Sequence, residues 1–257
     1  MRTVRGTAGA IVLEEHGEGD LPILMVHGMA GDAGFWRSTV AALPTSRRVI
    51  IPELRGHGRS ALPADGDQSI ASHAADLLGV LDQLEVERCI VIGHSFGASI
   101  AIEMARMAPT RVAGLVIVDG AGDFTELPAG ALAGFRTNLD SADHFLETVE
   151  GAIDVALAGA QPATELKVRA AMLAAPHPMV RSIYHALLGY RPTRALAGYP
   201  GPALLLSSPS NSADFALHAL LPELPHEAVP GVSHWIMMDA PDEMARILDT
   251  FALSITS

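Results

Sequence analysis

The chain has 257 residues, of which 49% are apolar and 18% are charged, so it can bury a sizeable core and is not expected to be disordered. Seventeen lysines and arginines stand against 29 aspartates and glutamates, which gives a formal net charge of −12. Because no basic run or stripe is present, this charge argues against nucleic acid and against an anionic membrane surface as partners.

The N-terminal region and the cysteine content bear on the cellular compartment. Residues 1–20 lack a long apolar segment with a small-residue cleavage site, and no apolar run is as long as a membrane span. The single cysteine, Cys89, cannot form an internal disulfide, and its apolar, strand-like surroundings are typical of a buried, unreactive thiol. We therefore expect a cytoplasmic protein.

Apolar segments of strand length alternate with amphipathic segments of helix length along the chain. The predicted strands are AIVLEEH (10–16), LPILMVHG (21–28), RRVIIPEL (47–54), RCIVIGHS (88–95), VAGLVIVDG (112–120), GPALLLSS (201–208) and HEAVPG (226–231). The predicted helices cover residues 36–43, 70–84, 97–108, 213–221 and 241–253. Strands without polar alternation are buried on both faces, so the pattern predicts an α/β fold with a mostly parallel sheet and helices on each side.

The alternation stops between residues 123 and 199, where the sequence shows helical patterns but no convincing strand. The clearest helices cover residues 141–160, with Ser141 as an N-cap, and 163–175. An all-helical insertion between strands of a parallel sheet predicts a cap, or lid, over the carboxyl ends of the strands. We therefore expect a core domain of residues 1–122 and 200–257 and a cap of residues 123–199.

The strongest chemical signal is the segment CIVIGHSFGASIAIEMA, which contains the pattern G-x-S-x-G between a strand and a helix. Ser95 occupies a tight turn that Gly93 and Gly97 make possible, and the turn holds its hydroxyl clear of both elements. The backbone N–H of Phe96 begins the helix and faces any oxyanion that develops beside Ser95.

Together with three further motifs, this turn resembles the α/β-hydrolase family over almost the whole chain. The other motifs are LMVHGMAGDAGFW (24–36), IPELRGHGRS (51–60) and GVSHWIMMDAPDEMARILDTF (231–251). The second departs from the family pattern, because Glu53 stands where an aspartate is more usual. The resemblance implies an α/β-hydrolase fold with an inserted helical cap, and it is nearest to the branch of serine-nucleophile esterases.

The resemblance also implies roles for individual residues. Ser95 would be the nucleophile and His234 the general base, since His234 lies in a loop before the last helix, as the family order of nucleophile, acid and histidine requires. The backbone N–H of Met29 would be the second oxyanion donor, beside that of Phe96. The residues expected to border the substrate are His27, Gly28, His94 and Trp235, of which His27 and His94 would chiefly shape their loops.

The acid of the expected triad is missing from its usual place. In the family the strand that corresponds to residues 203–206 is followed by Gly-x-x-Asp, and the aspartate orients the histidine. In LLLSSPSNSADF (204–215) that position is occupied by Asn211, which carries no charge. Loss of the charged group in a related triad costs on the order of 10⁴ in turnover. The acid must therefore come from elsewhere, or the site is impaired.

Three aspartates are candidates for this acid. Asp119 ends the strand VAGLVIVD (112–119), at the edge where parallel sheets place their chemistry, and certain haloalkane dehalogenases take their acid from the same strand end. Asp214 lies only three residues beyond Asn211, but it stands where a helix is expected to begin. Asp239 follows His234 by five residues. We favour Asp119, keep Asp214 as the alternative, and leave open a triad without a proper acid.

A serine at the tight turn predicts an acyl-enzyme, and it argues against the carboxylate nucleophile of dehalogenases and epoxide hydrolases. The expected substrate is a small molecule with an ester, thioester or lactone carbonyl, and the chemistry requires neither a metal nor an organic cofactor. The cap offers an apolar lining of Phe124, Leu132, Phe135, Leu139, Phe145, Met172, Met179, Tyr184 and Leu187. Two alternatives stay open: a ligand receptor or sensor with slow turnover, and a carbon–carbon bond hydrolase, perhydrolase or lyase on the same fold.

Overall fold

One sheet of eight strands runs through the molecule in the order β1-β2-β4-β3-β5-β6-β7-β8. The structure is a computed structural model, and it describes residues 1–256. Strands β3 to β8 run parallel, whereas β2 is antiparallel to both of its neighbours, so the sheet is mostly parallel as predicted. The strands span Arg2–Arg5 (β1), Ala10–His16 (β2), Ile23–Val26 (β3), Val49–Pro52 (β4), Cys89–His94 (β5), Val112–Val118 (β6), Ala203–Ser207 (β7) and His226–Ala228 (β8).

The central strands are buried on both faces, which explains why their sequences lack a polar alternation. Every residue of β3, β4, β5 and β6 is buried. The edge strand β1 was not predicted, because only Val4 of its four residues is buried and so short a segment shows no pattern. Cys89 lies at the start of β5, and burial raises the pKa of its thiol to about 12, as expected for an unreactive cysteine.

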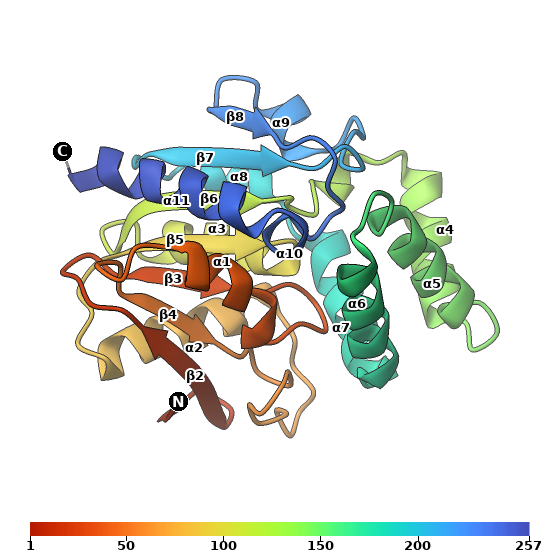
Figure 1. The fold of residues 1–257 in the computed structure, drawn as a ribbon. Coiled ribbons are helices and arrows are strands. Elements are labelled where there is room, and N and C mark those ends of the chain that lie inside the picture. The colour runs from red at the N-terminus through yellow and green to blue at the C-terminus, as the bar shows by residue number, and fades with distance from the viewer. Residues whose placement is uncertain (257) are drawn as a thin grey trace.

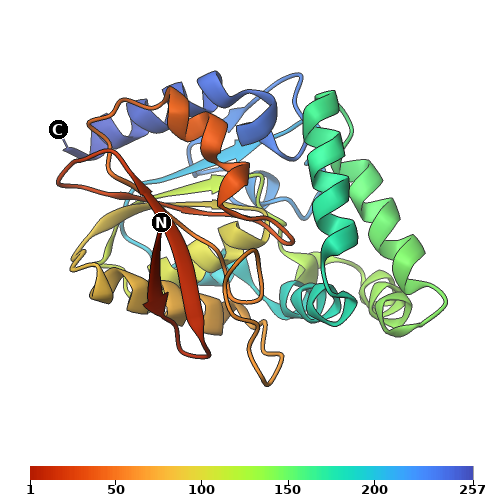
Figure 2. The same cartoon turned by 60° about the horizontal axis from the view of Figure 1, so that its bottom comes forward.

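Helices cover both faces of the sheet. In Figure 2 the first and last helices, α1 and α11, lie on one face, and α2 and α3 lie on the other. The helices span Arg37–Ala42 (α1), Ile70–Gln83 (α2), Phe96–Met107 (α3), Ala129–Asp140 (α4), Phe145–Ala156 (α5), Pro162–Ala174 (α6), His177–Gly189 (α7), Pro192–Leu196 (α8), Leu217–Leu220 (α9), Ile236–Asp239 (α10) and Pro241–Thr256 (α11), with short 3₁₀ turns at Ala33–Phe35 and Phe124–Glu126. This arrangement confirms the predicted α/β-hydrolase architecture.

One predicted helix is much shorter than expected. Residues 213–221 contain only the single turn α9, and Asp214 lies in a turn that precedes it. The N–H of Asp123, in the segment that follows β6, donates to the carbonyl of Phe215 over 2.9 Å, and this contact holds the chain around Phe215 in a turn. Asp214 therefore does not cap a helix.

Between β6 and β7 the chain makes only helices, α4 to α8, within the fully described stretch 123–199 that we call the helical insertion. Figure 1 shows α4 to α7 beyond the carboxyl ends of the strands, on the side toward which the arrowheads of β5 and β7 point. The last of these helices, α8, packs against α3 on one face of the sheet.

Among the hydrogen bonds that join the helical insertion to the rest of the chain, three involve α5, α6 and the segment between them. The N–H of His234 donates to the carbonyl of Ala156 at the end of α5 over 3.0 Å. The N–H of Gln161 donates to Asp239 over 2.9 Å, and the ammonium of Lys167 on α6 donates to the carbonyl of Gly34 over 2.6 Å. Helices α5 and α6 are thereby attached next to the loop that carries His234.

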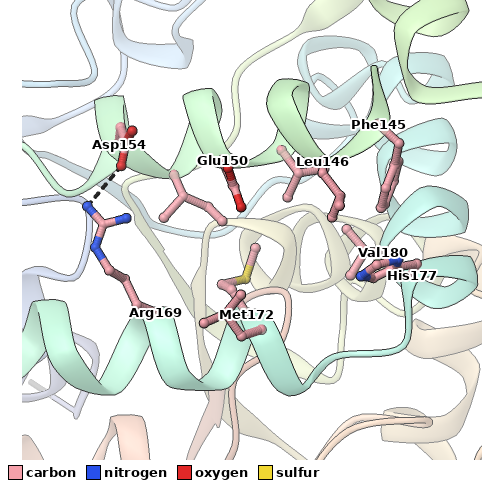
Figure 3. A pocket seen from close by; sticks show the side chains of 11 residues that line it. Phe145, Leu146, Glu150, Asp154, Arg169, Met172, His177 and Val180 are labelled. Carbon is pink, nitrogen blue, oxygen red and sulfur yellow. Dashed lines mark ion pairs between the residues drawn. The ribbon is translucent and has the colours of Figure 1, made fainter. Parts of the chain in front are cut away.

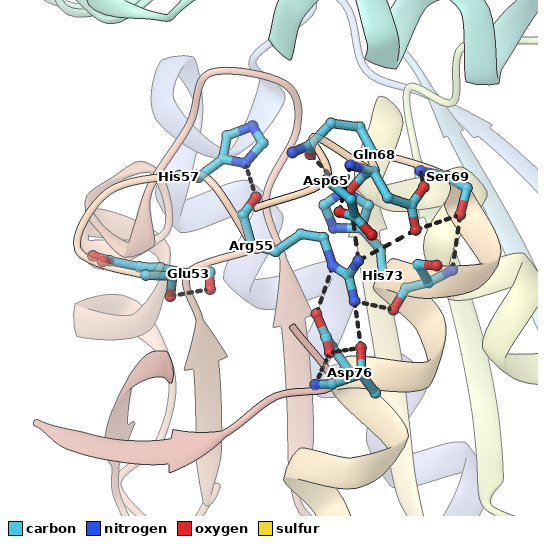
Figure 4. A network of polar contacts seen from close by, with 12 residues as sticks. Glu53, Arg55, His57, Asp65, Gln68, Ser69, His73 and Asp76 are labelled. Carbon is cyan, nitrogen blue, oxygen red and sulfur yellow. Dashed lines mark hydrogen bonds and ion pairs between the residues drawn. The ribbon is translucent and has the colours of Figure 1, made fainter. Parts of the chain in front are cut away.

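A buried polar network connects the loop after β4 to α2 (Figure 4). Nε of Arg55 donates to Asp76 over 2.7 Å, and the two side chains are 4% and 1% exposed. The guanidinium of Arg55 also reaches the hydroxyl of Thr7 and the carbonyl of Ser72. The pair thus joins the N-terminal hairpin, the loop after β4 and helix α2.

We expect Asp76→Ala to lower the free energy of unfolding by about 3–5 kcal/mol, because it leaves the Arg55 guanidinium buried without its main partner. Urea denaturation measures the change. Asp82→Ala is the matched control: Asp82 lies on the same helix and pairs with Arg111 over 2.9 Å, but its side chain is 65% exposed. An exposed pair contributes less than about 1 kcal/mol. Equal losses in the two variants would contradict the importance of the buried pair.

Candidate active site

Ser95 occupies the sharp turn between β5 and α3, with φ of 54° and ψ of −116°. This backbone conformation is sterically unfavourable for a residue with a side chain, and such strain is concentrated at functional sites. The flanking glycines are required by close packing. A Cβ atom on Gly93 would collide with the carbonyl of Gly97, and one on Gly97 would collide with the carbonyl of His27. The G-x-S-x-G pattern is thus explained by the geometry of the turn.

Asp119 and His234, which are 115 residues apart in the chain, form a hydrogen bond of 2.6 Å between Oδ2 and Nδ1. Asp119 follows β6 directly, is completely buried, and has φ of 45°, so its backbone is also strained. His234 lies in the loop before α10, and its side chain is 18% exposed. Since the carboxylate engages Nδ1 from the buried side, the ring presents its other nitrogen, Nε2, away from Asp119.

Asp119 accepts three further hydrogen bonds from the loop after β7. The N–H of Ser208 donates to Oδ1 over 2.7 Å and the hydroxyl of Ser208 donates to Oδ2 over 2.8 Å. Nδ2 of Asn211 donates to Oδ1 over 3.1 Å. Asn211, which occupies the position where the family has an aspartate, therefore helps to hold the Asp119 carboxylate in place. Neither the sequence pattern nor the resemblance indicated the role of Ser208.

The pKa of Asp119 lies below its ordinary value. Burial alone would raise it, but the hydrogen bond and the charge of His234, followed by the two hydrogen bonds from Ser208, outweigh burial. Asp119 consequently stays ionised at neutral pH, as an acid that stabilises an imidazolium must.

Ser95 and His234 face one cavity of about 190 Å³. Within the described part of the chain no hydrogen bond joins the Ser95 hydroxyl to His234, and such contacts are often long in unliganded sites. The cavity walls are mostly apolar, and they comprise Met29, His94, Ser95, Ala121, Phe124, Ala152, Ile153, Ala156, Met172, Tyr184, Leu187, His234 and Trp235. Four of the nine apolar residues predicted for the lining are among them: Phe124, Met172, Tyr184 and Leu187.

The backbone amides predicted as oxyanion donors belong to the first residue of α3 and to a loop beside the cavity. Phe96 is the first residue of α3, so its N–H has no partner within the helix. Met29 borders the cavity, in a loop packed against the turn of Ser95. The packing is tight, since a Cβ on Gly28 would lie 2.8 Å from Nδ1 of His94 and 3.2 Å from Cβ of Ser95.

The chain matches the family model described as the alpha/beta hydrolase family over residues 23–247. The chain belongs to the alpha/beta hydrolase family. The match covers the turn of Ser95, the strand end at Asp119 and the loop of His234. The sequence resemblance is thereby confirmed at the level of the family.

This alpha/beta hydrolase is similar to two curated relatives with different names and to one solved structure. A putative carbamate hydrolase, RutD, of Azorhizobium caulinodans is 42% identical over 47% of this chain and 44% of its own length. A 2-hydroxymuconate semialdehyde hydrolase of Pseudomonas sp. is 38% identical over 43% of this chain and 40% of its own. The chain thus matches less than half the length of these relatives. A thermophilic esterase of Thermogutta terrifontis has the same fold, with a TM-score of 0.84 at 22% identity and full coverage of both chains.

The structure corrects two residues expected to border the substrate. His27 is buried outside the cavity wall: its Nδ1 donates to the carbonyl of Gly28 over 2.8 Å, and its Nε2 accepts from the N–H of Leu54 over 3.0 Å. Gly28 packs behind His94 and does not line the cavity either. Of the four expected residues, His94 and Trp235 border the cavity.

The other two candidate acids lie apart from the His234 ring. Asp214 is exposed in its turn. Asp239 accepts from the N–H and the hydroxyl of Ser233 and from the N–H of Gln161, so it holds the loop of His234 rather than its ring. Sequence reasoning missed the lining residues Ala152, Ile153 and Ala156, although their spacing on α5 is that of one helical face.

Two other features are absent from residues 1–256. No group of three or more histidine, cysteine or acidic side chains could hold a metal ion. No helix in this part of the alpha/beta hydrolase is long and apolar enough to cross a membrane.

Proposed function

We propose that this chain is a serine hydrolase that cleaves a carboxylic ester, thioester or lactone through an acyl-enzyme on Ser95. The observation that carries the proposal is the 2.6 Å hydrogen bond between Asp119 and His234, made beside the strained turn of Ser95 at one cavity. A nucleophile, a base and a buried carboxylate that orients the base are the three parts that acyl transfer requires.

Nε2 of His234 takes the proton of the Ser95 hydroxyl while Oγ attacks the substrate carbonyl carbon. The resulting oxyanion is stabilised by the N–H groups of Met29 and Phe96, each contributing about 3 kcal/mol in the transition state. The imidazolium, stabilised by Asp119, then protonates the departing alcohol, thiol or ring oxygen. In the second half a water molecule loses its proton to His234 and attacks the acyl carbon, and the proton returns to Ser95 as the acid leaves.

We further propose that the helical insertion is the cap of this site and that residues 1–122 and 200–257 form the core. The insertion contributes Ala152, Ile153, Ala156, Met172, Tyr184 and Leu187 to the cavity wall, and all but the tyrosine are purely apolar. Burial raises the pKa of the Tyr184 phenol to about 12, so it stays neutral. Such walls favour a small substrate with an apolar body around its reacting carbonyl.

The alternative of a receptor with slow turnover drew its support from the missing acid at position 211. A charged carboxylate at Asp119, already bonded to His234, favours turnover instead. The names of the curated relatives refer to the cleavage of different kinds of bond, so they do not indicate the substrate of this chain. The proposal of an ester, thioester or lactone substrate is based on the arrangement of Ser95, His234 and Asp119 and on the apolar cavity.

Labelling with a fluorophosphonate tests the nucleophile without knowledge of the natural substrate. We expect one equivalent of probe on Ser95, located by mass spectrometry of the peptides, together with hydrolysis of p-nitrophenyl butyrate. Ser95→Ala should abolish both signals. Ser212→Ala, which removes an exposed serine, should retain both. Absence of labelling and of hydrolysis in the folded wild-type protein would refute the proposal.

A further inference from the structure

A second cavity of about 190 Å³ lies within the helical insertion, between α5, α6 and the beginning of α7. Figure 3 shows side chains from α5 and α6 facing each other across it, with Met172 pointing up from α6 and Phe145 and Leu146 pointing down from α5. Its apolar walls include Phe145, Val149, Ile153, Met172 and Val180. We call it the outer cavity, and we call the one that Ser95 faces the inner cavity.

The two cavities share two wall residues, Ile153 and Met172. Because these two side chains belong to both walls, the cavities are adjacent and the two side chains stand between them. Methionine is unbranched and adapts its shape readily, so Met172 can turn aside at little cost. The shared residues are thus positioned to border a passage between the two cavities.

The outer edge of the outer cavity is open to solvent, and part of it is apolar. Leu146 is 49% exposed and Leu173 is 76% exposed, and both border this cavity. Exposed leucines that meet at the mouth of an apolar cavity indicate contact with an apolar ligand.

The charged groups at this cavity do not favour an anionic ligand. Arg169 is paired with Asp154 over 2.8 Å and with Glu165 over 2.9 Å, so its charge is already compensated. Glu150 also borders the cavity and repels anions. The chemistry of the site therefore favours an uncharged, apolar group.

We propose that the outer cavity binds the far end of a linear apolar chain of the substrate whose carbonyl reacts at Ser95. An apolar cavity of about 150 Å³ accepts a six-carbon ring, so either cavity alone holds about six carbons. A chain of about eight or more carbons attached to the reacting carbonyl extends beyond the inner cavity, passes Ile153 and Met172, and ends in the outer one. This inference rests on the proposed function and specifies its substrate as a medium- or long-chain ester.

The test compares wild type, Leu173→Trp and Leu166→Trp on two series of esters. The first series is p-nitrophenyl acetate, butyrate, octanoate and decanoate; the second is the acetate esters of ethanol, butanol and octanol. Leu166 is the matched control, because it lies on the same helix and is 75% exposed but does not border the cavity. The two series distinguish a chain in the acyl part from one in the alcohol part. Both leucines are so exposed that their replacement leaves the core unchanged.

In the wild type we expect kcat/KM to rise along one series by up to about fourfold per buried methylene. Leu173→Trp fills the mouth of the outer cavity. In the series that shows the rise, it should therefore lower the ratio of kcat/KM for the long ester to kcat/KM for the short one at least tenfold. The ratio compares octanoate with acetate in the first series and octyl acetate with ethyl acetate in the second. Leu166→Trp should keep the wild-type ratio.

Two results would overturn the inference while the proposed function stands: short esters hydrolysed without any rise with chain length, or the same ratio in both tryptophan variants. A wild type that hydrolyses no ester and is not labelled by fluorophosphonate would instead refute the proposed function, and the inference with it.

Discussion

Replacing Asp119 with asparagine is expected to lower kcat for p-nitrophenyl butyrate by a factor on the order of 10⁴, with little change in KM. Asparagine has the same shape and can keep the hydrogen bond with the Ser208 N–H, so the fold and the cavity should persist. What is lost is the negative charge that the 2.6 Å contact brings to His234, and with it the stabilisation of the imidazolium in the transition state. Steady-state kinetics measures the loss, and circular dichroism verifies the fold.

Two variants make this result specific to position 119. Asp214→Asn removes an exposed carboxylate away from His234 and should change kcat less than twofold. In the double variant Asp119→Asn, Asn211→Asp, the carboxylate stands at position 211, whose side chain lies 3.1 Å from Oδ1 of residue 119 in the wild type. We expect kcat of this double variant to be at least tenfold higher than that of Asp119→Asn. A collapse of turnover in Asp214→Asn, with Asp119→Asn still active, would show that the acid has been assigned wrongly.

The second large effect concerns four buried histidines, one of which, His94, borders the inner cavity. His27, His57, His73 and His94 are each at most 2% exposed. Burial lowers the pKa of His27 to about 4 and, with the charge of His27, that of His57 to about 3. It also lowers the pKa of His73 and His94 well below their ordinary range. All four are therefore neutral in the folded protein at pH 5, whereas in the unfolded chain they begin to bind protons below about pH 6.5.

A base whose pKa is depressed by folding stabilises the native state fully above its unfolded pKa and progressively less as the pH falls below it. With pKa values of about 4 and 3 in the folded protein, His27 and His57 each lower the free energy of unfolding at pH 5 by about 2 kcal/mol. The other two histidines act in the same direction. The sum is a large fraction of the 5–15 kcal/mol typical of a domain. We therefore expect loss of most of the stability between pH 6.5 and pH 5.

Urea denaturation at pH 7.5 and at pH 5 measures this loss, and His57→Asn should reduce the difference by about 2 kcal/mol. Figure 4 shows His57 and His73 in the polar network around Arg55, in which Nδ1 of His57 bonds the carbonyl of Arg55 and Nε2 of His73 bonds Gln68. In the described part of the chain Nε2 of His57 and Nδ1 of His73 have no partner, so a proton added there would be buried without an acceptor. His144→Asn is the control, because that side chain is 60% exposed. Equal free energies of unfolding at the two pH values would contradict the argument.

The local patterns of the sequence were sufficient for the fold and for two members of the candidate site. Unbroken apolar runs predicted the central strands, since a strand buried on both faces needs no polar residue. The spacing of Gly93, Ser95 and Gly97 predicted the strained turn, because only glycine permits that approach of the backbone. The position of His234 before the last helix indicated its loop. Each of these features depends on a few consecutive residues.

The acid and the limits of the cavity were decided by tertiary structure. The sequence and the family resemblance favoured Asp119 and kept Asp214 as the alternative, but positions along the chain alone could not show which carboxylate meets His234. The ladder between β6 and β7, in which Val118 lies opposite Leu206 and the N–H of Asp119 bonds the carbonyl of Leu206, brings the two strand ends together.

Asn211 and Ser208 thereby reach the Asp119 carboxylate from about 90 residues away. Helix α5 lines both the inner and the outer cavity. Its position next to His234 likewise depends on contacts between segments that are distant in the chain. Such contacts are set by strand register and helix packing, and neither is encoded in a short run of residues.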